Sequence, residues 1–455
     1  MNSFQCLSLS PIELAHPGLA VATTRAGGVG ILDLEFCRNL GEKETIGAIP
    51  QAIKNLDRLL ELVPQEAVGL RLPEARIQES QTILFKMSGH SHWLIFCRWN
   101  PQTIQDAIAS LPPSSTRKIL LEVTDINQIS QLPRVHGLIA KGQESGGWGG
   151  VDSAFVLTQK LIERQPLPVY VQGGIGIHTI AACRAAGAAG VVLDDQLWLM
   201  PESPLPQEWQ RYLSNLNGQE AIAIGERLLG SCRVLSRPGF SAISTLQKLA
   251  QTLEIQDDPS RILTDAAPNS EWFSKAQPLI GWGTPGTLAW PMGQAVGLAV
   301  GFRDRFHTTG RLIQALLKAS QEHLKIAQNN RTLGADAPLA LSHGTKYPIV
   351  QGPMTRVSDS AEFANAVSGA GALPLLALAL MRGEQVRELL HKTKALIGDR
   401  AWGIGILGFV PQAVRDEQLK EVLAVKPPFA LIAGGRPDQA AHLESQGIAT
   451  YLHVP

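Results

Sequence analysis

The sequence has no excess of charge of either sign. Forty lysine and arginine residues balance forty aspartate and glutamate residues in a chain of 455, and charged residues make up 18% of it. A surface without a field of one sign attracts neither nucleic acid nor anionic lipid. We therefore expect no nucleic-acid partner.

Cysteine is also scarce, and the five cysteines are widely spaced. No CxxC pair occurs, and no histidines cluster at the spacing of metal ligands. The pattern argues against a zinc site or any other metal and indicates reduced thiols, which are typical of a cytoplasmic protein. The N-terminus has no basic segment followed by an apolar run, and no apolar run reaches membrane-spanning length. The sequence thus predicts a cytoplasmic protein that does not contact a membrane.

Short apolar runs are abundant in the first 200 residues, and segments with a helical pattern separate them. The runs lie at 6–9, 28–34, 67–72, 93–97, 118–123, 137–142, 167–174 and 190–195. Buried parallel strands have continuous apolar sequences, and their alternation with helices produces a parallel sheet. Eight such units predict an α/β fold, a closed (β/α)8 TIM barrel over 1–200. A doubly wound open sheet is the alternative.

The rest of the chain divides into three parts. Residues 201–328 are irregular and glycine-rich, with helical stretches, and predict an appended, mainly helical subdomain that returns to the barrel. Residues 329–346 have the composition of a linker. Residues 347–455 contain five strand-like runs, and 363–378 is similar to 19–34. This repeat predicts the first part of a second, truncated TIM barrel, with a small flavodoxin-like sheet as the alternative.

Five strands would leave an unpaired edge and bare apolar faces. We therefore expect that the chain is part of a longer polypeptide or is completed by a partner.

The stretch "GQESGGWGG" follows the sixth predicted strand, at the face where barrels carry their chemistry. Gly146 and Gly147 would let a ligand approach the backbone. Glu144 and Trp148 would face the mouth, where the indole could stack on a flat ring. The alternative is a glycine-rich turn with Trp148 packed on the barrel top. No histidine lies in the stretch, so no general base is evident.

A second glycine pair, Gly173 and Gly174, ends the seventh predicted strand and precedes a helix. This position commonly binds phosphate through backbone N–H groups, although a tight turn without a ligand has the same pattern. Asp194 and Asp195 end the eighth strand, where two carboxylates would repel a dianion unless they are paired or turned away. Gln294 lies on a small-residue face that either returns to the mouth or packs against a helix.

Four motifs together resemble the nitronate monooxygenase family, formerly 2-nitropropane dioxygenase, which includes flavin-dependent enoyl reductases. They are "GQESGGWGG", "PVYVQGGIG", "AAGAAGVVLDDQLWL" and "MGQAVGLAVGFRD", and the resemblance covers most of 10–325. The stretch "YPIVQGPMTRVSDSAEFANAVSGAGALP" resembles the start of a second domain of the same family. The combination is similar to the paired barrels at the front of large cyanobacterial or bacterial type I polyketide synthases, which continue into ketosynthase and acyltransferase domains.

The resemblance implies a fold, a cofactor and a reaction. An FMN would lie across the barrel top, with NAD(P)H as the reductant of an enoyl reductase. The substrate would be an unsaturated acyl chain, carried by a carrier protein or free, or a nitronate-type small molecule. The resemblance assigns the cofactor contacts to the following residues: Gly146, Gly147, Gly173, Gly174, Gln294, Gln351, Gly352 and Met354.

Three departures from the family pattern concern the first barrel. Trp148 stands where the family has its histidine, the first strand has no "QGPM", and Asp194 and Asp195 replace small or hydroxyl residues. Two hypotheses follow. The protein is an FMN-dependent oxidoreductase-type domain of a polyketide or fatty-acid synthase, or it is a catalytically inactive structural or docking module of one. A third, a phosphate-ligand barrel enzyme without flavin, would require a base that the sequence does not show.

Overall fold

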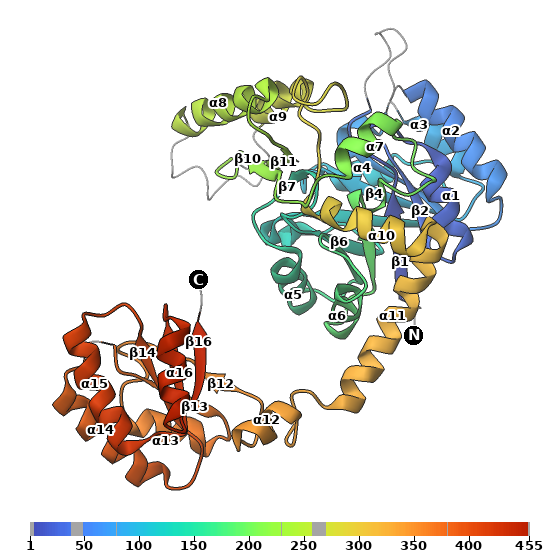
Figure 1. Cartoon of the computed structure of the whole chain (residues 1–455). Helices are drawn as coiled ribbons and strands as arrows, with labels where there is room; N and C mark the ends of the chain where they lie inside the picture. Colours follow the sequence, from blue (N-terminus) through green and yellow to red (C-terminus); the bar gives the residue numbers. More distant parts are fainter. Residues whose placement is uncertain are drawn as a thin grey trace. The chain divides into compact units, whose positions relative to one another are not determined.

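The computed structural model describes residues 4–37, 49–78, 80–228, 230–256, 270–379 and 381–453 of the chain. The chain forms two compact units, Met1–Leu324 and Lys325–Pro455, and each is described by itself (Figure 1). Within the described residues, none of the helices has the length and apolar character needed to cross a membrane. The five cysteines are free thiols.

Eight parallel strands of the first unit close into a barrel in chain order, and the last strand pairs with the first. The predicted (β/α)8 barrel is confirmed, and the open-sheet alternative is wrong. The strands are β1 (Gln5–Leu9), β2 (Val29–Asp33), β3 (Val68–Pro73), β4 (His92–Cys97), β5 (Arg117–Val123), β6 (Gly137–Lys141), β8 (Val169–Gln172) and β9 (Gly190–Leu193).

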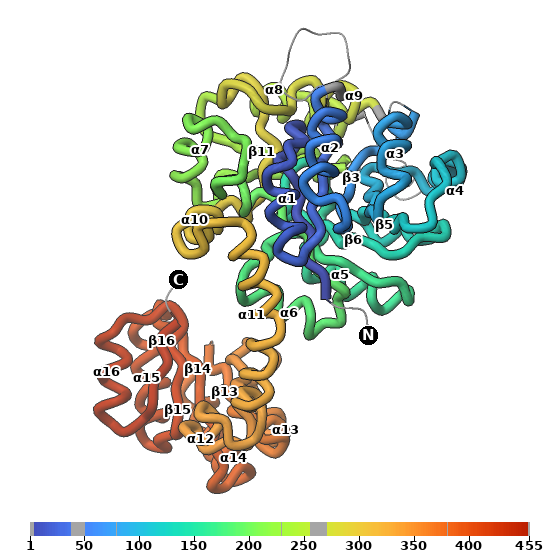
Figure 2. The backbone as a smooth tube through the Cα atoms, turned by 90° about the vertical axis from the view of Figure 1, so that its right-hand side faces the viewer, coloured from blue at the N-terminus to red at the C-terminus, as the bar shows by residue number. Residues whose placement is uncertain are grey.

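Helices cover the outside of this barrel (Figure 2). They are α1 (Pro17–Arg25), α2 (Ile49–Leu62), α3 (Gln81–Met87), α4 (Ile104–Ala109), α5 (Ala154–Arg164) and α6 (Thr179–Ala185). The helix α2 shows why they pack there, because Ala52, Leu56 and Leu59 recur at spacings of three and four and are buried against the strands. Short 3-10 turns lie at Glu74–Arg76, Ile126–Gln131, Asp195–Leu197, Gln277–Leu279 and Gln294–Leu298.

The barrel interior is filled by alternate residues of the strands. Leu7, Ile31, Ile95 and Leu120 belong to one buried apolar cluster inside the barrel. Since side chains alternate across a strand, the residue two positions further on also points inward, one layer closer to the mouth. This period places a specific set of residues at the carboxyl end of the barrel.

The appended subdomain of the first unit contains strands that the sequence analysis did not predict. β7 (Gly147–Gly149), β10 (Ala221–Ile224) and β11 (Ser231–Leu235) form an antiparallel sheet in the order β10-β11-β7. The subdomain is mainly helical, as predicted, and this small sheet is an addition to the prediction. β7 comes from the glycine stretch, more than 60 residues before its partner strand, so no local pattern reveals the pairing.

The helices of this subdomain are α7 (Gln207–Leu213), α8 (Ser241–Gln256), α9 (Ser270–Ala276), α10 (Ala299–Phe306) and α11 (Thr309–Asn330). α8 and α9 lie side by side in both views (Figures 1 and 2). α11 returns to the barrel, where Leu312, Ile313 and Leu316 pack with residues of β9 and α6.

The second unit is an open sheet of five parallel strands in chain order. The strands are β12 (Val350–Gln351), β13 (Leu373–Ala377), β14 (Gly403–Leu407), β15 (Phe429–Ala433) and β16 (Ala449–His453). A flavodoxin-like sheet has the order 2-1-3-4-5, so that alternative is wrong, and the predicted partial barrel is confirmed.

The helices of the second unit are α12 (Pro338–His343), α13 (Ala361–Gly369), α14 (Gly383–Ile397), α15 (Gln412–Val425) and α16 (Pro437–Ser445). α12 lies within the stretch that was expected to be a linker, and the ring of its His343 stacks on Phe429.

Candidate active site at the mouth of the first barrel

A layer of polar side chains lies at the mouth, directly above the apolar interior. Asp33, Arg71, Glu122 and Lys141 come from β2, β3, β5 and β6, and none is more than 3% exposed. Each stands two residues after an interior residue of the same strand, so its side chain points into the barrel axis. Barrel enzymes carry their catalytic groups at these strand ends. The sequence analysis did not single out these four residues.

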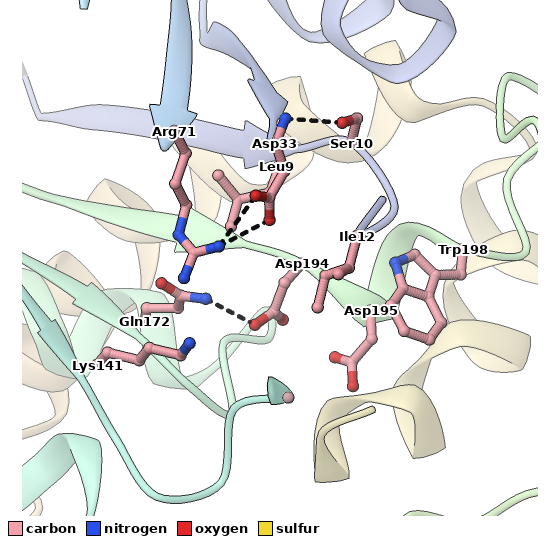
Figure 3. A pocket seen from close by; sticks show the side chains of 11 residues that line it. Leu9, Ser10, Ile12, Asp33, Arg71, Lys141, Gln172, Asp194, Asp195 and Trp198 are labelled. Carbon is pink, nitrogen blue, oxygen red and sulfur yellow. Dashed lines mark hydrogen bonds and ion pairs between the residues drawn. The ribbon is translucent and has the colours of Figure 1, made fainter. Parts of the chain in front are cut away.

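Arg71 is the centre of this layer, and Figure 3 shows its pairing with Asp33. Its Nε and Nη2 donate to the two carboxylate oxygens of Glu122 at 2.8 and 3.0 Å. Its Nη1 donates to Asp33 at 2.9 and 3.0 Å and to Glu35 at 2.7 Å. The planar guanidinium suits such paired contacts, and they hold its orientation. Nε, Nη1 and Nη2 of Arg71 therefore all donate to these three carboxylates.

Lys141 supplies the second positive charge, 3.5 Å from Glu122. Two cations thus face three carboxylates without access to water. Burial would raise the pKa of Glu122, but Arg71 and Lys141 together lower it. Burial raises the pKa of Asp33 to about 6 despite the opposing effect of Arg71, and the neighbouring Glu35 adds to this rise. The layer is a buried ion-pair network with three carboxylates and two cations, so one carboxylate is in excess of the positive charges.

Trp148 lies in the core and does not face the mouth. It is 2% exposed, and its ring contacts Phe36, Trp272 and Phe273 at centroid distances of 6.4, 6.1 and 4.4 Å. Its strand β7 pairs with β11, so the indole joins the barrel top to the appended subdomain. The alternative stated for the sequence, a tryptophan packed on the barrel top, describes its position.

The glycines of this stretch allow two backbones to meet. A Cβ on Gly146 would lie 2.8 Å from the nitrogen of Gly293, and a Cβ on Gly293 would lie 2.7 Å from the nitrogen of Gly146. Either substitution would push the two segments apart. Gly147 has a φ of +74°, a conformation that favours glycine. Glycine at these positions therefore permits a close contact between two backbone segments of the chain.

The side chain of Glu144 lies against the glycine turn after β8. A Cβ on Gly173 would lie 2.9 Å from Cγ of Glu144. The Glu144 carboxylate accepts the backbone N–H of Ala154, at the start of α5, at 3.1 Å. The predicted phosphate turn at Gly173 and Gly174 therefore has a carboxylate beside it, held by a helix N-terminus.

Two further carboxylates follow β9. Asp194 accepts from Nε2 of Gln172 at 3.0 Å, and Asp195 accepts from the backbone N–H of Gly293 at 2.6 Å. Burial raises the pKa of Asp195 well above its usual range, and the adjacent Asp194 raises it further. Both aspartates are buried, so they are not turned away from the mouth onto the surface.

The remaining predicted contacts lie in two places. Gln294 begins a 3-10 turn beside the mouth, where its backbone N–H donates to the carbonyl of Glu144 at 2.8 Å, but its side chain is exposed. Gln351, Gly352 and Met354 lie in the second unit, at and just after β12, and Met354 is 46% exposed. Gly146, Gly147, Gly173 and Gly174 come together at the first mouth with Glu144.

Little space remains at this mouth. A cavity of about 10 Å³, lined by residues of the polar layer with Ile12 and Trp198, lies between Lys141 and Asp195 (Figure 3). Such a volume holds about one water molecule. Oε1 of Gln172 and Oδ1 of Asp195 are buried without a hydrogen-bond partner among the described residues.

The fold and this mouth define the class of the first unit: a closed parallel (β/α)8 barrel with an antiparallel subdomain added at the mouth. No protein-family model matches the chain, and no curated protein sequence matches it. Solved structures do match. FabK from Thermotoga maritima is 18% identical with a TM-score of 0.53, and the match covers 72% of this chain and 96% of that chain.

Two other solved structures cover a similar share. The enoyl reductase domain of MlnA from the macrolactin biosynthesis cluster of Bacillus amyloliquefaciens is 10% identical, with a TM-score of 0.50 over 71% of this chain and 95% of that chain. A nitroalkane oxidase from Streptomyces ansochromogenes is 16% identical, with a TM-score of 0.47 over 70% and 96% of the two chains. The matches to FabK and MlnA show that the first unit has the fold implied by the resemblance to flavin-dependent enoyl reductases.

The residues at the mouth do not fit an FMN. The resemblance places the flavin phosphate at the turns after β8 and β9, and here the side chains of Glu144 and Asp194 lie at those turns. A phosphate dianion about 4 Å from one carboxylate would be repelled by roughly 8 kcal/mol at an effective dielectric constant of 20. The ring would have to share the barrel top with the network around Arg71, where the cavity is about 10 Å³.

Proposed function

We propose that the first unit is a catalytically inactive barrel that acts as a structural module of a polyketide or fatty-acid synthase. One observation carries the proposal: the network of Asp33, Glu35, Arg71, Glu122 and Lys141 closes the mouth where a barrel enzyme binds its substrate. The carboxylates accept from Arg71 or lie beside Lys141, so the network holds its own groups in place at the barrel axis.

The link to a synthase rests on two further points. The fold matches the MlnA domain, which belongs to a biosynthesis cluster. The chain also carries a second partial barrel of the same kind, as in the paired barrels that its motifs resemble. The proposed partners are therefore the other domains of that synthase, and an acyl substrate would be handled by those domains.

A binding experiment tests the inactive barrel. The purified chain is mixed with FMN, separated from free FMN by gel filtration and scanned for flavin absorbance near ~450 nm, and then assayed with NADH or NADPH and a crotonyl thioester. We expect no retained flavin and no thioester reduction. Retention of one FMN per chain together with reduction of the thioester would identify the first unit as a flavin oxidoreductase instead.

The synthase association has its own test. An antibody against the first unit is used to probe extract of the native cells. We expect it to detect a polypeptide much heavier than the 49.0 kDa of this chain. A single band at that mass would count against a module built into a megasynthase.

A further inference from the structure

A cavity of about 190 Å³ lies in the second unit, between α15 and α16. Ile406 and Ile432 form its floor, at the carboxyl ends of β14 and β15, and Leu419 of α15 forms one wall. Both isoleucines belong to the apolar cluster between the sheet and its helices, so the cavity lies on the outer side of the sheet. It is therefore separate from the concave face where a complete barrel would have its mouth.

The rim of this cavity is basic. Arg415 and Gln439 come from the two helices, and each donates to the carbonyl of Gly408 at 3.2 Å. This shared acceptor holds both side chains at the cavity without neutralising the guanidinium. Arg436 also lines the cavity and pairs with Asp438 at 2.9 and 3.0 Å. With neutral histidine, the charged side chains of the lining carry one net positive charge.

The helices add to this potential. Arg415 and Gln439 lie in the first turn of α15 and of α16, so both helices begin at this rim. The N-terminal end of a helix carries a partial positive charge, which favours an anion. His442, one turn further along α16, also lines the cavity.

We propose that this cavity binds a small anion that has a phosphate or carboxylate head and a short apolar chain. The head contacts Arg415 at the rim, because a guanidinium matches the geometry of both groups. The chain lies on Ile406, Leu419 and Ile432. The volume is below that of a pocket for a drug-sized ligand, so the chain is only a few carbon atoms long. The inference does not depend on the function proposed for the first unit.

Calorimetric titration of the whole chain tests the site with three probes: inorganic phosphate, butyl phosphate and hexanoate. We expect butyl phosphate to bind at least tenfold more tightly than inorganic phosphate, since burying its methylene groups adds affinity. If hexanoate binds more tightly than butyl phosphate, the natural head is a carboxylate, and the reverse order indicates a phosphate. Equal affinity for phosphate and butyl phosphate, or no binding of either organic anion, overturns the proposal.

Variants locate the site. Arg415→Gln should weaken butyl phosphate binding by about tenfold or more, whereas Lys392→Gln, which removes one exposed positive charge of α14, should leave it unchanged. Leu419→Ser should remove most of the preference for butyl phosphate over inorganic phosphate. Leu419→Ser is the variant that tests the site if Arg415→Gln does not fold. Wild-type affinity in Leu419→Ser, or an equal loss in Lys392→Gln, would show that the anion binds elsewhere.

Discussion

The closed barrel and the partial barrel of this chain differ at matching positions of their strands. The internal repeat aligns Asp33 of β2 with Ala377 of β13. Across the next strand, Asp33 pairs in register with Arg71, and Ala377 pairs with Gly405. A buried ion pair in the first unit therefore corresponds to an alanine and a glycine in the second.

β1 and β12, the first strands of the two units, also differ in how deeply their matching side chains are buried. Ser8 of β1 pairs with Gly30, and Gln351 of β12 pairs with the aligned Pro374. Ser8 is fully buried and donates to Thr23, whereas Gln351 is half-buried at the start of the "QGPM" motif. The comparison teaches that the same strand scaffold carries buried charged side chains at these positions in the first unit, and small residues in the second, where Pro353 packs on Gly405.

The largest expected effect comes from removing the charge that holds the first mouth together. Arg71→Met leaves Asp33, Glu35 and Glu122 buried without their partner, and we expect the first unit to lose about 3–5 kcal/mol of stability. Urea unfolding followed by tryptophan fluorescence measures this, because eight of the nine tryptophans precede residue 325.

The control for this variant is Arg58→Met. Arg58 is 61% exposed and pairs with Glu61 on the surface of α2, so its loss should cost less than about 1 kcal/mol. Similar losses in both variants would mean that the network around Arg71 contributes no more than a surface pair.

Trp148 tests whether the glycine stretch is a core or a ligand loop. Trp148→Ala should destabilise the first unit by about 3–5 kcal/mol because it removes a buried aromatic from the junction with the subdomain. Phe155→Ala, at a side chain that is 70% exposed, should change stability by less than about 0.5 kcal/mol. A Trp148→Ala variant with wild-type unfolding would argue for a ligand-facing indole.

The stability of the first unit should depend on pH through Asp195. Its pKa is raised in the folded protein, so between the unfolded and folded pKa values the folded state retains a proton that the unfolded state releases. The free energy of unfolding should therefore fall as pH rises through this window. Asp195→Asn cannot ionise, and its stability should decline less steeply than that of the wild type as pH rises above the pKa of an unfolded aspartate.

The control for this experiment is the same substitution at Asp304, which is exposed. Asp304→Asn should keep the wild-type slope. If Asp195→Asn also keeps that slope, Asp195 is ionised in the folded protein, and the description of the buried acidic pair needs revision.

The smallest effects concern the two first strands. Ser8→Ala should cost the first unit about 1–2 kcal/mol, since it leaves the buried hydroxyl of Thr23 without its donor. Gln351→Ala should cost the second unit less than about 0.5 kcal/mol, because Gln351 is half-buried and accepts a 3.3 Å bond from Leu375. Fluorescence of Trp402 follows the second unit. Equal costs would remove the contrast between the two mouths.

The sequence predicted the strands of both barrels because buried parallel strands leave continuous apolar runs. It did not predict β10 and β11, which are short, or their pairing with β7, which depends on residues distant in sequence. Arg71 and Lys141 are each the single charged residue of such a run, and Glu122 shares its run with Lys118. The alternation of side chains along each strand is visible in the sequence and places these residues on one face of their strands. Only the closed barrel shows that residues from different strands meet at its axis.

The central proposal is that the mouth of the first barrel is a closed core that binds no flavin. Scanning calorimetry of the whole chain, with and without 1 mM FMN, tests it through the transition that Arg71→Met lowers. A ligand that binds the folded state at 1,000 times its Kd stabilises it by about 4.1 kcal/mol. We predict no shift of that transition in FMN. A rise equivalent to several kcal/mol would contradict the account and show that the mouth opens to the cofactor.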